Sequence, residues 1–158
     1  MEPRIISKER LLVAGLTGDG RDTGKMWKDF DEKQAANPFP QADQSGYEIR
    51  FYAGEKPVIP GGDVHVGFAV AENCQPEGFS VQALPATAYA CFDVLVARGY
   101  DSRNQEMNRW LTDHADQYAQ RQLDGRCYVL ECYTEKFKGG NQPDSVVEIW
   151  IPLVKRMA

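Results

Sequence analysis

Two segments near the end of the sequence combine a carboxylate with an aromatic ring at a spacing of two residues. Segment 126–134 (RCYVLECYT) carries Glu131 and Tyr133, and segment 145–154 (SVVEIWIPLV) carries Glu148 and Trp150. Both segments are rich in β-branched and aromatic residues, which predicts strands, and side chains two residues apart share one face of a strand. A carboxylate beside tyrosine and tryptophan rings suits an organic cation, because the carboxylate supplies charge and the rings supply cation–π attraction.

The alternation within the two strands predicts which face each pair occupies. The last segment has one wholly aliphatic face, formed by Val147, Ile149 and Ile151. We expect that face to pack against helices, which leaves Glu148 and Trp150 on the opposite face. If the neighbouring strand turns Leu130 and Cys132 toward the helices, Glu131 and Tyr133 join Trp150 on one ligand-binding face.

Both carboxylates also have simpler interpretations. Glu131 is compatible with a solvent-facing strand position, and Glu148 fits equally well as a second acidic group of the site or as a partner in a surface salt bridge. Two carboxylates in an apolar cleft would also permit general acid–base chemistry. No nucleophile motif accompanies His65 or His114, and no Cys/His spacing is typical of zinc, so no catalytic triad, metal or cofactor is expected.

The predicted elements follow the order strand, helix, strand, strand, and this order occurs twice. The first half comprises residues 4–17, 23–36, 46–53 and 63–71, and the second comprises residues 79–96, 102–121, 126–134 and 145–154. Thr23 is the expected N-cap of the first helix, and Ser102 with Gln105 forms a capping box for the second. Pro85 is expected at a bulge or an edge, because proline lacks the N–H that a strand ladder needs.

A repeat of about 80 residues in a chain of 158 predicts a pseudo-symmetric α+β domain rather than a solenoid. We expect a single domain over residues 1–158, made of two βαββ halves at about 1–75 and 76–158. Each half would form an antiparallel sheet with its helix on one face, and Trp27 and Trp110 would pack there. The groove between the halves is then the natural site for a ligand.

Composition narrows the class of partner. The net charge of −5, without a cluster of lysine and arginine, disfavours nucleic acid and mildly favours cations. No stretch approaches the roughly 18 apolar residues that a membrane span requires, and the first residues do not form a signal peptide. A cytoplasmic protein without membrane contact is therefore expected, with reduced thiols at Cys74, Cys91, Cys127 and Cys132.

Several motifs resemble those of the GyrI-like effector-binding family, the small-molecule-binding domain of some bacterial multidrug-responsive transcription activators and of stand-alone proteins. They are the strand LPATAYACF, the helix that contains Trp110, and the segments YVLECYT and DSVVEIWIPL. The resemblance covers nearly the whole chain and implies two βαββ units around a central ligand groove. It also implies that Glu131 pairs with a lipophilic cation, and that the rings around it are Tyr133, Trp150, Tyr89 and Phe51.

The resemblance leaves three classes of function. We favour a stand-alone module that binds or sequesters a small lipophilic cation; a chain that starts at its first strand is not expected to carry the DNA-binding part of the regulators. The enzyme alternative is a hydrolase of reactive cyclopropane-type compounds that uses Glu131, together with Glu148 and a tyrosine hydroxyl. The third class is an inhibitor that binds a protein partner, DNA gyrase.

Overall fold

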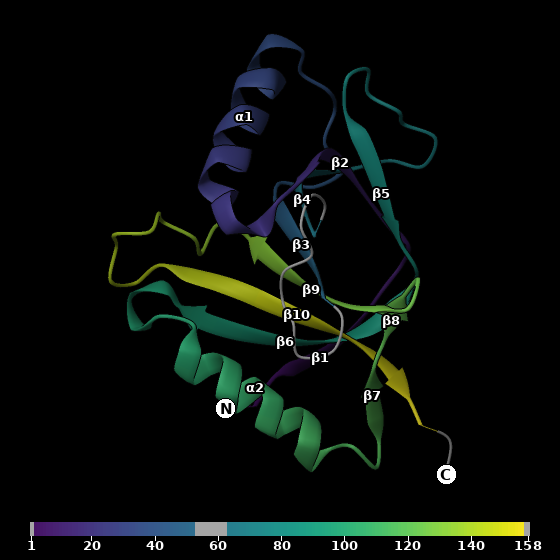
Figure 1. Ribbon diagram of the computed structural model, residues 1–158, viewed down its shortest axis with the longest axis vertical. Coiled ribbons are helices and arrows are strands. Elements are labelled where there is room, and N and C mark those ends of the chain that lie inside the picture. The colour runs from purple at the N-terminus through teal and green to yellow at the C-terminus, as the bar shows by residue number, and fades with distance from the viewer. Residues whose placement is uncertain (1, 53–62, 157–158) are drawn as a thin grey trace.

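The computed structural model describes residues 2–52 and 63–156, and it has an α+β fold (Figure 1). The expected fold class is therefore confirmed. The helices are α1 (Thr23–Ala36) and α2 (Asp101–Asp113), and short 3-10 turns precede them at Gly20–Asp22 and Val96–Arg98. The strands are β1 (Arg4–Lys8), β2 (Leu11–Gly18), β3 (Gly46–Tyr52), β4 (Val64–Val70), β5 (Ser80–Leu84), β6 (Thr87–Leu95), β7 (Tyr118–Gln120), β8 (Gln122–Leu123), β9 (Arg126–Tyr133) and β10 (Val146–Lys155). Ala53, the predicted end of the third strand, lies outside the described residues.

The strands of the described residues form one antiparallel sheet. Its order is β1-β6-β10-β9-β3-β4-β2-β5, with β7 paired to β10 and β8 paired to β9. Strands β2, β3 and β4 come from the first half of the chain, and β6, β9 and β10 come from the second. The pair β3–β9 joins the halves, so the two sheets expected from the repeat are continuous with each other.

The first strand of each half pairs with a strand of the other half. The single strands predicted at residues 4–17 and 79–96 are each interrupted, the first at Glu9 and the second at Pro85. As a result β1 pairs with β6, and β5 pairs with β2. Pro85 has no backbone N–H to continue the ladder, which explains why the chain changes its partner strand there.

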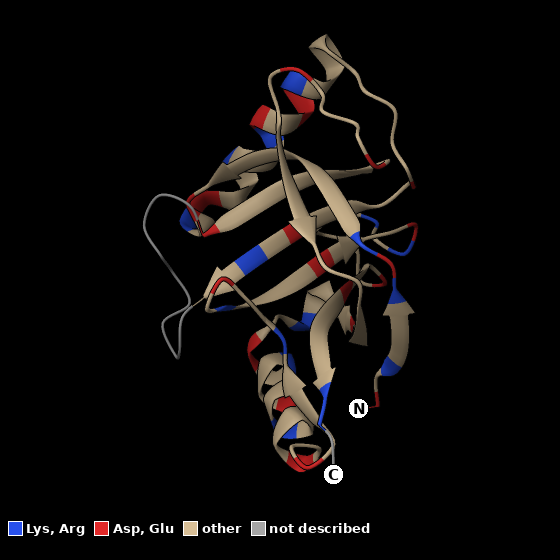
Figure 2. Ribbon diagram, turned by 90° about the vertical axis from the view of Figure 1, so that its right-hand side faces the viewer, with Lys and Arg blue, Asp and Glu red and all other residues tan. Residues whose placement is uncertain are grey.

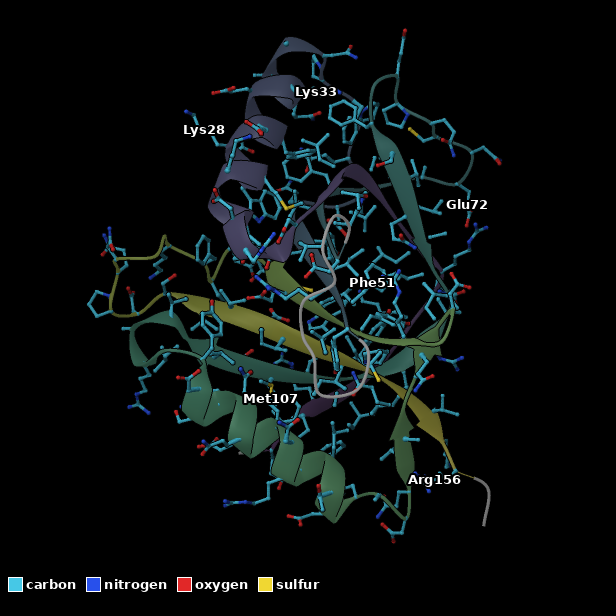
Figure 3. The ribbon with its side chains drawn as sticks, in the orientation of Figure 1. Lys28, Lys33, Phe51, Glu72, Met107 and Arg156 are labelled. Carbon is cyan, nitrogen blue, oxygen red and sulfur yellow. The ribbon has the colours of Figure 1, made fainter. Side chains whose placement is uncertain are left out.

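Both helices cover the same face of the sheet. Phe30 of α1 packs in a cluster with Leu12, Ala14, Val64 and Val66 of β2 and β4. Met107, labelled in Figure 3 on the side of α2 that faces the strands, packs with Trp110 on Val147, Ile149 and Ile151 of β10. The predicted contact of the aliphatic face of β10 with a helix is confirmed, and so is the packing of Trp110 on the sheet.

The face turned away from the helices closes on itself as an inner core. Its buried side chains are Val13, Tyr47, Ile49, Phe51, Ala69, Leu84, Tyr89, Cys91, Tyr128, Leu130, Cys132 and Trp150. Phe51 lies among the side chains that fill the space between the strands (Figure 3). The cluster joins Val13 of β2 to Tyr89 of β6, strands far apart in the sheet order, so the sheet must curl. The ligand groove expected on this face is thus replaced by the protein's own side chains.

Helix α2 is shorter than the predicted helix over residues 102–121. It ends at Asp113, His114 forms its C-cap, and Tyr118 already belongs to β7, which pairs with the end of β10. Tyr118 still packs in the same cluster as Met107 of α2. Tyr118 has the spacing of a further residue on the apolar face of the helix, although it belongs to a strand. The apolar pattern alone therefore did not predict where α2 ends.

The predicted helix caps are wrong by one or two residues. Asp22, rather than Thr23, caps α1, since its carboxylate accepts from the backbone N–H of Lys25. Ser102 lies inside α2, whose N-cap is Tyr100 and has no side-chain capping bond. Neither helix of the described residues is long and apolar enough to cross a membrane.

Strands β2 and β4 approach each other closely at two glycines. Gly15 and Gly67 are register partners. A Cβ atom added to Gly67 would lie 2.0 Å from the carbonyl oxygen of Ala14, and one added to Gly15 would lie 1.7 Å from that of Val66. Any larger residue at either position would therefore have to force the two strands apart.

Candidate functional site

Charged side chains lie on the strands that join the two halves, between the helices. In Figure 2, red and blue bands lie on the central strands, between α1 at the top of the view and α2 at the bottom. Glu48 of β3 and Glu131 of β9 are directly opposite each other, and Arg50 shares the face of Glu48. With three neighbouring rings these residues form what we call the central acidic strip: Glu48, Arg50, Glu131, Trp27, Tyr100 and Tyr133.

The register shows that the strip lies on the face that carries the helices. Glu48 is opposite Val66, which packs under α1, and Glu131 is opposite Ile149, which packs under α2. Directly opposed residues in an antiparallel pair point to the same side of a sheet. The two glutamates therefore lie between the helices and not in the inner core.

Both carboxyl groups are buried and they share one guanidinium. Glu48 is 2% exposed and Glu131 is 8% exposed. The Nε atom of Arg50 lies 2.9 Å from Glu48 Oε2 and 2.7 Å from Glu131 Oε2, and its Nη2 atom lies 2.9 Å from Glu48 Oε2. The indole Nε1 of Trp27 donates a bond of 3.0 Å to Glu48 Oε1. Donors thus hold Glu48 at both oxygens, whereas Arg50 holds Glu131 at one.

The surroundings of Glu131 disfavour its ionised form. Burial, the hydrogen bond with Glu48 and the negative charge of Glu48 raise the pKa of Glu131 to about 8, although Arg50 acts in the opposite direction. A carboxyl group in such a place keeps its proton at neutral pH. The charge of Arg50 is then balanced by Glu48, and Glu131 is a neutral acid that a new cation would ionise.

Aromatic rings flank the carboxyl pair on the helix side of the sheet. Trp27 of α1 meets Tyr133 edge-on, with ring centroids 5.6 Å apart, and Tyr133 meets Phe137 at 4.8 Å. Burial, and then the charge of Glu131, raise the pKa of Tyr100 to about 12. The same causes raise the pKa of Tyr133 above its usual range, so both hydroxyls stay protonated. Partly exposed rings beside an acid offer stacking and cation–π contact to a flat or bulky cation.

Two of the six site residues predicted from the sequence, Glu131 and Tyr133, lie in the strip. Trp150 is opposite Leu130 and packs in the inner core, so it faces away from Glu131. The prediction that Glu131, Tyr133 and Trp150 share one face is wrong, because β9 turns Leu130 and Cys132 into the inner core rather than toward the helices.

The other predicted residues lie on the inner-core side. Tyr89 and Phe51 are buried there, and the ring of Tyr89 is 5.5 Å from that of Trp150. Glu148 accepts a bond of 3.1 Å from Trp150 Nε1. It also forms salt bridges of 3.1 Å with Arg4 and 3.2 Å with Lys136. Glu148 thus forms the salt bridges of the second interpretation, but its carboxylate is buried rather than at the surface.

The sequence interpretation missed four members of the strip: Glu48, Arg50, Trp27 and Tyr100. One signal would have found Glu48. The paired helix tryptophans, Trp27 and Trp110, are 83 positions apart, and Glu48 and Glu131 are also 83 positions apart. Matching the halves at this spacing places a glutamate of each half at the same point of the repeat. Arg50 and Tyr100 have no such signal, because only the tertiary structure brings β3 and the start of α2 close to Glu131.

Surface hollows occur elsewhere on the described part of the chain. One is lined by Leu16, Asp22 and Met26 beside α1, and another by Phe39 and Phe68, and neither is lined by Glu131. Arg50 contacts both carboxyl groups of the strip, and Trp27 contacts Glu48. A ligand that takes the place of Arg50 at Glu131 would therefore require this side chain to move.

No metal-binding group of three or more His, Cys, Asp or Glu side chains occurs in residues 2–52 and 63–156. The four cysteines are free thiols, two of them buried in the inner core. The chemistry that these described residues offer is thus an acid pair with an arginine and aromatic rings.

Comparison with known proteins identifies relatives of this fold. No family model matches the chain. The chain is 26% identical over 160 residues to the transcriptional regulator BrlR of Pseudomonas aeruginosa. This alignment covers 97% of the chain and 56% of BrlR. The chain thus spans little more than half of that regulator.

Solved structures with the same fold include one with a bound small molecule and two of EcmrR. SAV2435 bound to tetraphenylphosphonium matches with a TM-score of 0.70 and 12% identity, covering 98% of this chain and 94% of SAV2435. The EcmrR C-terminal domain matches with a TM-score of 0.66 and 15% identity, covering 98% of each chain. EcmrR in a complex with DNA matches with a TM-score of 0.68 and 13% identity, covering 98% of this chain and 58% of EcmrR. The chain therefore shares its fold with SAV2435 and the EcmrR C-terminal domain, in agreement with the resemblance of its motifs to the GyrI-like effector-binding family.

Proposed function

We propose that this protein binds a small lipophilic cation at the central acidic strip, with Glu131 as the group that pairs with the cation. The observation that carries the proposal is the geometry around Glu131. This carboxyl group is buried, lies opposite a second carboxyl group, and has Tyr133 and Tyr100 beside it. Such a group gains more from an added positive charge than an exposed carboxylate does, because little water screens the interaction.

The difference between the two glutamates supports Glu131 as the ligand-binding one. Glu48 is held by the indole of Trp27 and by two nitrogen atoms of Arg50, so its lone pairs are largely committed to the fold. Glu131 accepts a bond from one nitrogen of Arg50 and faces Glu48, without a bond from the indole, so fewer donors of the fold hold it. A cation of delocalised charge, such as a phosphonium or an aromatic ammonium, is also cheaper to remove from water than a compact ammonium ion.

The relatives support the same class of ligand. SAV2435, which shares this fold, has been solved with tetraphenylphosphonium, a lipophilic cation. BrlR is a transcriptional regulator, and EcmrR has been solved in a complex with DNA. This chain spans little more than half of each, and we propose for it the ligand-binding step; its net charge of −5 disfavours a contact with nucleic acid.

Titration with tetraphenylphosphonium, followed by tryptophan fluorescence and by calorimetry, tests the proposal. Glu131→Gln keeps the shape but cannot ionise beside a cation, and we expect it to weaken binding by on the order of 2–5 kcal/mol. Glu148→Gln is the matched control, because Glu148 is also 8% exposed and also pairs with basic residues, but lies on the other side of the sheet. We expect the control to bind as the wild-type protein does.

Two results would overturn the proposal. One is the absence of binding by the folded wild-type protein at millimolar tetraphenylphosphonium. The other is equal loss of binding in the Glu148→Gln and Glu131→Gln variants. Mass spectrometry of the ligand after incubation separates binding from hydrolysis, since a bound compound is recovered unchanged.

A further inference from the structure

Arg50 occupies the position that a ligand cation would take beside Glu131. Its Nε atom lies 2.7 Å from Glu131 Oε2 and 2.9 Å from Glu48 Oε2, so the guanidinium bridges the two carboxyl groups. Arg50 follows Glu48 by two residues on β3 and reaches across to β9. The strip therefore already contains a cation, supplied by the chain itself.

We infer that Arg50 is a built-in counter-ion that sets the affinity and the charge selectivity of the strip, because a ligand cation reaches Glu131 only when the guanidinium has moved off it. The inference rests on the proposed function, since it concerns the same site. The inference adds Arg50 as a specificity-determining residue, which competes with the ligand for Glu131 and makes no favourable contact with the ligand.

The contacts of Arg50 allow it to release Glu131 and stay paired. Its side chain is 38% exposed, whereas the side chains of Glu48 and Glu131 are 2% and 10% exposed. The contact of Nη2 with Glu48 does not involve Glu131, and a guanidinium has five N–H donors. Rotation toward solvent thus frees Glu131 while the Glu48 partner is kept. The buried glutamates have no comparable freedom.

Competition of this kind reduces the apparent affinity for a cation. When the competent arrangement is a minor population, the observed Kd equals the intrinsic Kd divided by that population. A guanidinium that is off Glu131 for about one part in ten to one part in a hundred of the time would weaken binding about 10- to 100-fold. A neutral ligand of the same shape gains nothing from Glu131, so its affinity should depend much less on Arg50.

The experiment compares Arg50→Gln with the wild-type protein in binding tetraphenylphosphonium and neutral triphenylphosphine oxide. Measurement at about pH 9 keeps the proton on Glu131 from masking the effect, since a lost arginine also favours that proton. Arg4→Gln is the matched control, because Arg4 likewise pairs with two carboxylates, Glu148 at 3.1 Å and Asp93 at 3.2 Å, away from the strip. We expect Arg50→Gln to bind the phosphonium at least about 10-fold more tightly, and Arg4→Gln and the neutral ligand to show no such change.

A second readout covers the case in which Arg50→Gln does not fold. In the wild-type protein, the side-chain Nε–H resonance of Arg50 should shift as tetraphenylphosphonium saturates the site. Phosphonium binding with an unshifted resonance, or unchanged or weaker affinity of a folded Arg50→Gln variant, overturns the inference and leaves the proposed function intact. Failure of the wild-type protein to bind the phosphonium overturns the proposed function instead.

Discussion

Cation binding at the strip should release a proton, and its affinity should depend on pH in a defined direction. Burial and Glu48 raise the pKa of Glu131 to about 8, from an ordinary value of 4.5. A cation beside Glu131 reverses this effect and favours the ionised form. Between these two values the free protein therefore holds a proton that the complex does not, and raising the pH favours the complex.

The magnitude follows from the size of the shift. Below the raised pKa, each pH unit changes the ionised fraction of Glu131 about tenfold, which corresponds to about 1.4 kcal/mol. The Kd for a lipophilic cation should therefore fall about 100-fold between about pH 6 and pH 9 and change little above that range. Folding stability has the opposite sign: the proton on Glu131 stabilises the free protein fully below its ordinary pKa, and this contribution is lost as pH rises through about 8.

Calorimetric titration with tetraphenylphosphonium, repeated at several pH values and in two buffers of different ionisation enthalpy, measures both the Kd and the protons released. We expect about one proton released per cation near pH 7. The Glu131→Gln variant should show weak binding without this dependence, and Glu148→Gln should behave as the wild-type protein does. A Kd that is constant from pH 6 to pH 9, or heats that do not depend on the buffer, would refute the reasoning.

Two further predictions concern the frame that holds the strip. Trp27→Phe keeps a ring but removes the donor to Glu48, and should lower the free energy of unfolding by about 1–3 kcal/mol in urea denaturation. Trp110→Phe is the control, because the indole N–H of Trp110 has no hydrogen-bond partner among the described residues. An equal loss of stability in the two variants would contradict the argument. Gly67→Ala should destabilise by more than about 3 kcal/mol, because its Cβ would lie 2.0 Å from a backbone oxygen. Gly140→Ala, where no atom lies within 4 Å, should change stability by less than about 0.5 kcal/mol, and similar melting temperatures for the two glycine variants would refute the close approach.

The repeat and the local patterns were readable from the sequence because they depend on residues close together in the chain. The helix predicted at residues 23–36 has the bounds of α1, and the aliphatic alternation of Val147, Ile149 and Ile151 predicted the side of β10 that meets a helix. Alternation along one strand is a local property, since successive side chains point to opposite faces. The C-terminal end of α2 was harder to predict, because Tyr118 pairs with Lys155 of β10, which is distant in sequence.

The tertiary structure alone decided which side of β9 carries the proposed site. Both faces of RCYVLECYT mix aromatic with other residues, so neither is recognisably the buried one, and a change of register by one residue exchanges them. The pairing of Trp150 with Leu130, and of Ile149 with Glu131, places Glu131 under the helices. The residues that complete the site, Glu48 and Arg50, come from the other half of the chain. The sequence by itself thus determined that a carboxylate and rings occur on paired strands, and only the long-range backbone pairing, with the curl that buries Trp150, determined which of them meet.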